Sequence, residues 1–225
     1  MLDNYINLLR PKIEEMFKSE SSGHDISHLI RVMDIALYIQ SKEGGDRTVV
    51  GVSAFLHDIH RLEQNKTGKY CSPKESLPMI EKLLEEISFP KDLTKKVLNA
   101  IEYHEVYNWN QDEIKTTEKE ALILQDADNV DGTGAMGIAR TFAYAGSKNI
   151  PLHTADFSVE EICSEKYKEG KGRVETPIEL FYHKLLILGE HMNTETAKKM
   201  TKDRDLFMRQ FIDEFLREWD GKYES

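Results

Sequence analysis

The sequence has few cysteines and lacks a long apolar run. Its two cysteines, Cys71 and Cys163, form no CxxC motif, which excludes a disulfide framework and a zinc ribbon. No apolar stretch approaches the ~20 residues that cross a bilayer, and the N-terminus lacks the basic and apolar regions of a signal peptide. We therefore expect a cytoplasmic protein with reduced thiols and no membrane partner.

Positive charge is also scarce. Lys and Arg total 30 against 40 Asp and Glu, which gives a formal net charge of -10. This balance excludes nonspecific binding to a nucleic acid polymer or an anionic membrane, since both need a basic surface. A small phosphorylated substrate remains compatible, because it meets only the local field of its pocket. The composition predicts no oligomeric state.

Apolar residues recur at helical period along almost the whole chain, so we expect an all-α fold. With 225 residues, of which 40% are hydrophobic, the chain suits one well-packed domain spanning 1–225. Residues 61–73 are polar and contain Gly68 and Pro73, which predicts a loop. The expected helices span 3–20, the segment from Asp25 or Ser27 to 41, 47–59, 74–88, 91–104, 117–130, the segment from the glycines at 132–137 to 145, 177–191 and 194–219.

The segment 146–176 is the least regular part of the chain. It contains Gly146, Pro151, Gly170 and Gly172 around a short helical stretch near 158–168. An insertion of this kind is often a lid or a binding loop. A plain surface loop is the alternative, and the residues do not choose between the two.

The dipeptide His57-Asp58 ends an apolar run, where a polar pair has little use in packing. Other chemistry-bearing residues lie at a distance, namely His28, His104, Asp126 and Asp128. Imidazole nitrogens and carboxylate oxygens together are typical ligands of divalent metals in hydrolases. Each histidine alone is more often a hydrogen-bonded structural residue. Asp126 and Asp128 lie on opposite sides of a helix, and both sides have apolar neighbours, so periodicity does not choose between them.

Three separated motifs, at residues 23–32, 55–59 and 123–131, occur in the order His, His-Asp, Asp. In this order and register the chain resembles the HD superfamily of metal-dependent phosphohydrolases, and the similarity extends over nearly its whole length. The resemblance implies a single-domain helical bundle and assigns the metal to His28, His57, Asp58 and Asp128. Asp128 is preferred over Asp126 because Ala127-Asp128-Asn129-Val130 matches the context of the last Asp in the family.

The resemblance further implies hydrolysis of a phosphate ester or anhydride of a small molecule, such as a nucleotide, by metal-activated water. The ion would be Mn²⁺, Mg²⁺, Fe²⁺, Ni²⁺ or Zn²⁺, since mixed nitrogen and oxygen ligands do not choose among these metals. His104 is expected near the substrate, as a phosphate ligand or a general acid. Arg31 and then Arg61 are the candidates that stabilise phosphate charge, with Lys69 and Lys74 after them.

The sequence departs from the family pattern at His60, where many small HD hydrolases carry a small residue. Dinuclear HD phosphodiesterases add two histidines before the last Asp, and here only His60 and His104 are present, so we favour one ion. A cyclic-nucleotide phosphodiesterase is the alternative enzyme. A non-catalytic regulator that binds a metal or nucleotide is the alternative from another class, and an HD-type di-iron oxidase needs more ligands than the sequence offers.

Overall fold

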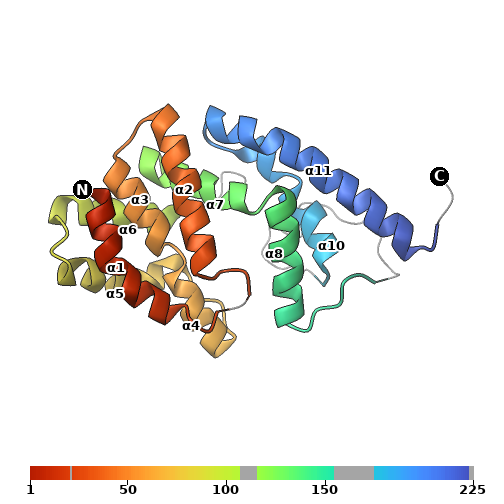
Figure 1. Ribbon diagram of the computed structural model, residues 1–225, viewed down its shortest axis with the longest axis horizontal. Helices are drawn as coiled ribbons and strands as arrows, with labels where there is room; N and C mark the ends of the chain where they lie inside the picture. Colours follow the sequence, from red (N-terminus) through yellow and green to blue (C-terminus); the bar gives the residue numbers. More distant parts are fainter. Residues whose placement is uncertain (21, 107–115, 155–174, 223–225) are drawn as a thin grey trace. The chain divides into compact units, whose positions relative to one another are not determined.

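The structure is a computed structural model that describes all residues except 21, 107–115, 155–174 and 223–225. These described residues form helices and no strand (Figure 1), which confirms the all-α prediction. The chain divides into two compact units, Met1–Asp128 and Asn129–Ser225. A single domain over 1–225 stays a prediction.

The first unit contains the helices on which the candidate ligands were expected. They are α1 (Leu2–Met16), α2 (Ile26–Glu43), α3 (Arg47–Leu56), α4 (Ile59–Thr67), α5 (Pro73–Glu86), α6 (Lys91–Tyr103) and most of α7 (Lys119–Asp131).

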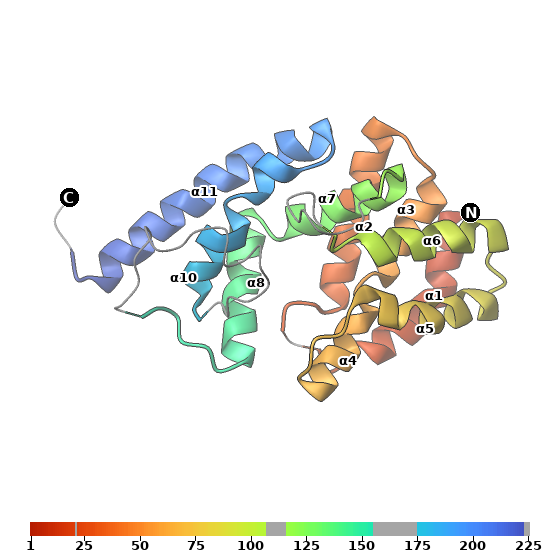
Figure 2. The same cartoon turned by 180° about the vertical axis from the view of Figure 1, so that it is seen from behind.

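Helix α3 is the centre of this unit and packs against α1, α2 and α6 (Figure 2). Its residues are apolar on all sides, and every residue from Val49 to Leu56 is buried. A helix without a polar face is stable only when its neighbours cover it completely. The helix begins at Asp46, whose carboxylate accepts hydrogen bonds from the backbone amides of Thr48 and Val49, as N-cap residues do. The buried C-terminal end of α3 therefore delivers His57 to the interior of the unit.

The second unit follows Asp128 and is built around aromatic side chains. Phe142 lies 5.8 Å from Phe211 and 5.8 Å from Phe215 between ring centroids. Phe181 lies 6.2 Å from Phe211. The sequence predicts that Phe207, Phe211, Phe215 and Trp219 of the last helix are core, and this is wrong: Phe207 and Trp219 are exposed, Phe211 and Phe215 are half-buried, and Phe181 is the buried ring. The elements of the unit are α8 (Gly134–Ser147), α10 (Pro177–Leu180), a π-helix η2 (Phe181–Leu185), a 3₁₀ helix η3 (Leu188–His191) and α11 (Glu195–Trp219).

The glycines between α7 and α8 form the expected sharp junction. Gly134 has φ 68°, a conformation that L side chains rarely adopt. A Cβ on Gly137 would lie 2.2 Å from the carbonyl oxygen of Gly132. Close backbone packing at this turn therefore requires glycine at position 137.

Three expectations about helices were wrong. The expected helix 47–59 ends at Leu56, and α4 begins at Ile59 after a break at His57-Asp58. Residues 61–67 continue helix α4 instead of forming a loop, because Glu, Gln and Lys are good helix formers in spite of their polarity. The expected helix 177–191 is divided into α10, η2 and η3. Among the helices that the structure describes, none combines the length and the apolar character that a bilayer-crossing segment needs. The segment 146–176, which the sequence predicts to be either a lid or a plain surface loop, lies largely outside the described residues.

Candidate metal centre

The candidate ligands of the first unit lie at or near the ends of its helices. The side chain of Asp25 caps α2 by accepting a hydrogen bond from the backbone amide of His28, which fixes His28 in the first turn. His57 and Asp58 form the junction between α3 and α4. His104 directly follows α6. The backbone therefore turns at the points where these side chains converge.

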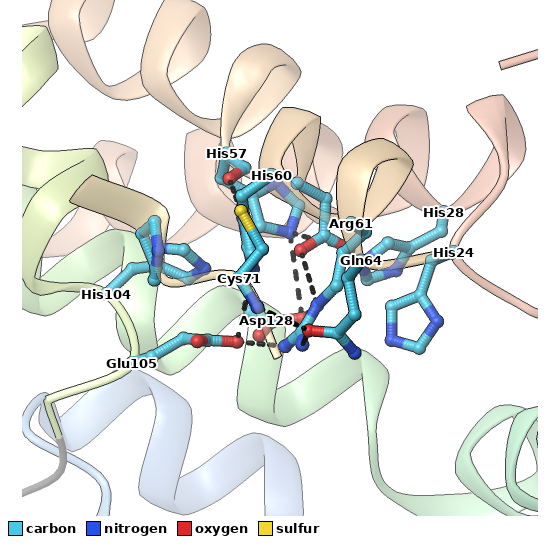
Figure 3. Close-up of polar contacts among 12 residues, drawn as sticks. His24, His28, His57, His60, Arg61, Gln64, Cys71, His104, Glu105 and Asp128 are labelled. Carbon is cyan, nitrogen blue, oxygen red and sulfur yellow. Dashed lines mark hydrogen bonds and ion pairs between the residues drawn. The ribbon is translucent and has the colours of Figure 1, made fainter. Parts of the chain in front are cut away.

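Two imidazoles and two carboxylates meet in the interior of the unit (Figure 3). The Nε2 atom of His28 lies 3.2 Å from Asp58 Oδ2 and 3.5 Å from Asp128 Oδ1. The Nε2 atom of His57 lies 3.7 Å and 3.8 Å from the same two oxygens. These four side chains are thus brought together as the resemblance implied.

The rings of His57 and His104 are each held by a hydrogen bond to a backbone carbonyl three residues earlier. Nδ1 of His57 is 2.8 Å from the carbonyl oxygen of Ala54, and Nδ1 of His104 is 2.7 Å from that of Ile101. A carbonyl oxygen only accepts, so Nδ1 carries the proton in each hydrogen bond. Nε2 then presents its lone pair in the neutral ring, which is the form that binds a metal.

Burial keeps these rings neutral. It lowers the pKa of His57 to about 4, although the carboxylates of Asp58 and Asp128 act in the opposite direction. It also lowers the pKa of His104. Burial opposes ionisation of Asp58, but His57 and His28 outweigh it and hold the pKa of that carboxyl well below its usual range. At neutral pH the imidazoles of His57 and His104 are therefore neutral and Asp58 is a carboxylate.

The donor set fits a divalent metal. Nε2 of His57 and Nε2 of His104 are buried and make no hydrogen bond with any residue that the structure describes. Buried polar atoms without such a partner are rare and call for an explanation, of which a bound ion is one. The structure contains two groups of three possible ligands, and within each group the ligand atoms all lie within 4.8 Å of one another. The first group is His28, His57 and Asp58, and the second is His57, His104 and Asp128.

Asp128 and Asp126 occupy different surroundings. Asp128 directs Oδ1 at the two imidazoles of the cluster, whereas Asp126 is fully buried and belongs to neither group of ligand atoms. The geometry therefore favours Asp128, the residue that the family context selected and that helical periodicity alone could not select.

Arg61 lies next to the cluster and contacts three side chains. Its Nε is 3.5 Å from Asp58 Oδ1, and its Nη1 donates to Gln64 Oε1 at 3.1 Å. Its Nη2 donates to Glu105 Oε1 (Figure 3). Burial opposes ionisation of Glu105, but the guanidinium of Arg61, together with His60 and His104, outweighs it and holds the pKa of that carboxyl well below its usual range. The same oxygen of Glu105 lies 3.7 Å from Nε2 of His60.

The other cationic candidates are Arg31, Lys69 and Lys74. Arg31 lies on α2, three residues after His28, and is half-buried. Lys74 is exposed and pairs with Glu102 at 2.9 Å, and Lys69 is exposed. The sequence assigned no role to Glu105. Its position beside His104 was the only available signal, because its contact with Arg61 depends on the tertiary fold.

Comparison with known proteins agrees with this arrangement. The family model described as HD domain matches residues 25–133, a range that contains every ligand candidate. A crystal structure of an HD-superfamily hydrolase from Bacillus thuringiensis is 28% identical, with a TM-score of 0.70, and the match covers 99% of this chain and 100% of that one. The chain belongs to the HD superfamily of hydrolases. HD domains are metal-dependent, which agrees with the His and Asp side chains that could hold an ion here.

This HD-superfamily hydrolase is also similar to YpgQ of Bacillus subtilis, an uncharacterized protein. The two sequences are 29% identical over 213 residues, which are 95% of this chain and 93% of YpgQ. A crystal structure of YpgQ in complex with ADP has a TM-score of 0.68 and 30% identity, and the match covers 92% of this chain and 96% of that one. The similarity therefore extends well beyond the residues that the family model matches.

Proposed function

We propose that this protein hydrolyses a phosphate ester or anhydride of a small molecule and that His28, His57, Asp58 and Asp128 hold a divalent metal for the reaction. The observation that carries the proposal is the convergence of two buried imidazoles on two carboxylate oxygens at 3.2–3.8 Å. Such ligands suit Mn²⁺, Mg²⁺, Fe²⁺, Ni²⁺ or Zn²⁺. A divalent ion supplies Lewis acidity, which lowers the pKa of bound water and polarises a phosphoryl oxygen.

His104 contributes a fixed proton acceptor. Its Nδ1 is committed to the carbonyl of Ile101, so the neutral ring offers Nε2 as an acceptor and has no second N–H for a phosphate oxygen. This favours uptake of a proton from the attacking water over the phosphate-binding and general-acid roles expected from the resemblance.

The two arginines have different tasks in the proposed reaction. Arg31 supplies positive charge for the phosphate from the helix that carries His28. Arg61 is engaged by Asp58, Gln64 and Glu105, so it can bind a phosphate only by giving up one of these contacts. Positive charge placed before the substrate arrives stabilises the negative charge of the transition state.

A nucleotide is the favoured substrate class. The crystal structure of the relative YpgQ in complex with ADP supports this choice. The second group of ligand atoms, from His57, His104 and Asp128, shares His57 with the first. Because Nδ1 of His57 is committed to the carbonyl of Ala54, only Nε2 can bind a metal, so the ligands favour one ion over the two-ion site of a cyclic-nucleotide phosphodiesterase.

Turnover of a panel of phosphorylated compounds tests the proposal. Purified protein with Mn²⁺ is assayed for phosphate or pyrophosphate release from nucleotides, sugar phosphates and a cyclic nucleotide. We expect hydrolysis by the wild type and by Asp34→Asn, an exposed control on α2, and no hydrolysis by Asp58→Asn. Metal-loaded protein that hydrolyses none of the panel would contradict catalysis and favour the regulator. Activity on the cyclic nucleotide alone would favour the phosphodiesterase.

A further inference from the structure

Glu105 is a largely buried carboxylate that neither the family motif nor the proposed ligand set includes. Its side chain is 14% exposed and that of its partner Arg61 is 21% exposed. The backbone around it is anchored, because the carbonyl of Val106 accepts a hydrogen bond from Gln125 Nε2 at 2.7 Å and its amide donates to the carbonyl of Tyr103 at 3.0 Å. Glu105 therefore presents its carboxylate from a fixed position.

The two oxygens of Asp58 face different partners. Oδ2 points toward the ligand cluster, 3.2 Å from Nε2 of His28. Oδ1 faces Nε of Arg61 at 3.5 Å. Arg61 thus forms an ion pair with one oxygen of the carboxylate, and the other oxygen faces the cluster. Outer partners of this kind set the orientation of a ligand.

Arg61 needs a second anion, besides Asp58, to keep its guanidinium in this position. A buried guanidinium needs carboxylate or amide acceptors for its fork of N–H donors, and Glu105 and Gln64 supply them. Without the charge of Glu105, Arg61 still faces the carboxylate of Asp58. The guanidinium would then compete with a metal ion for that carboxylate.

We propose that Glu105 is a positioning residue, which holds Arg61 against Oδ1 of Asp58 and so keeps Oδ2 available to the metal. This inference rests on the proposed function, since it treats Asp58 as a metal ligand. Glu105 acts through Arg61 and touches neither the metal nor the substrate. It therefore controls metal affinity without being a ligand.

Mn²⁺ binding, measured by isothermal titration calorimetry, tests the inference without an assay of activity. Glu105→Gln keeps the shape and removes the charge, and we expect the dissociation constant for Mn²⁺ to rise about 10–100-fold. Glu105→Asp retains the charge and should restore a large part of the affinity. Glu102→Gln is the matched control, because Glu102 lies on α6 and pairs with the exposed Lys74, and its affinity should equal that of the wild type.

A double-mutant cycle separates this role from a general effect on folding. On an Arg61→Gln background, Glu105→Gln should change the dissociation constant by less than about twofold, because the arginine through which it acts is gone. Equal effects with and without Arg61 would overturn the inference, as would unchanged affinity in folded Glu105→Gln or failure of Glu105→Asp to restore binding. Wild type that binds no Mn²⁺ would overturn the proposed function, whereas tight binding by both wild type and Glu105→Gln would overturn only the role of Glu105.

Discussion

Acid should destabilise the metal-free protein through His57. The pKa of this ring is about 4 in the folded chain, since burial disfavours its charged form, and 6.5 is its ordinary value. Between these two values the unfolded chain binds a proton that the folded chain does not, so stability falls as pH falls. The stability that neutral His57 permits is fully present above pH 6.5, and the free energy of unfolding is lower by about 2 kcal/mol at pH 5.

Urea denaturation of chelator-treated protein at pH 7.5 and pH 5 measures this loss. His57→Gln removes the titrating ring and leaves the rest of the chain unchanged. We expect the free energy of unfolding to drop by about 2 kcal/mol more in the wild type than in the variant over this interval. Equal drops in the two proteins would refute the reasoning that buried, neutral His57 opposes protonation.

Two further predictions concern the second unit, and urea denaturation checks both. Gly137→Ala should lower the free energy of unfolding by about 3 kcal/mol, because its Cβ would lie 2.2 Å from the backbone oxygen of Gly132; unchanged stability would contradict close packing at this turn. Arg140→Met should cost about 3 kcal/mol, since it leaves the carboxylate of Asp131 buried without the guanidinium that now lies 3.0 Å away. A loss below about 1 kcal/mol would show that this pair behaves like a surface pair.

The helices could largely be predicted from the sequence, because apolar residues recur at helical period and caps such as Asp46 mark the ends. Helix α4 was missed because its polar residues suggested a loop. The break at His57-Asp58 was also missed, since no glycine or proline stands between Val52 and Ile59 to mark it. Local patterns thus predict helices well and predict the turns between buried helices poorly.

The sequence indicated which residues form the candidate site, but it did not indicate the contacts that surround them. The motif order selected His57 and Asp58, but the choice of Asp128 over Asp126 needed the family context, because both lie on helix faces with apolar neighbours. Glu105 could not be assigned a role, since its partner Arg61 lies 44 residues away in the sequence and meets it only in the tertiary fold. The choice between a lid and a plain surface loop at 146–176 stays open, because most of this segment lies outside the described residues.

The metal content of the purified protein tests the central claim most directly. After incubation with Mn²⁺ and removal of free ion, inductively coupled plasma mass spectrometry gives the number of ions bound per chain. We predict one ion in the wild type and in Asp126→Asn, and none retained in Asp58→Asn or Asp128→Asn. Folded wild-type protein that retains no ion, or an Asp126→Asn variant that loses the ion while Asp128→Asn keeps it, would contradict the account.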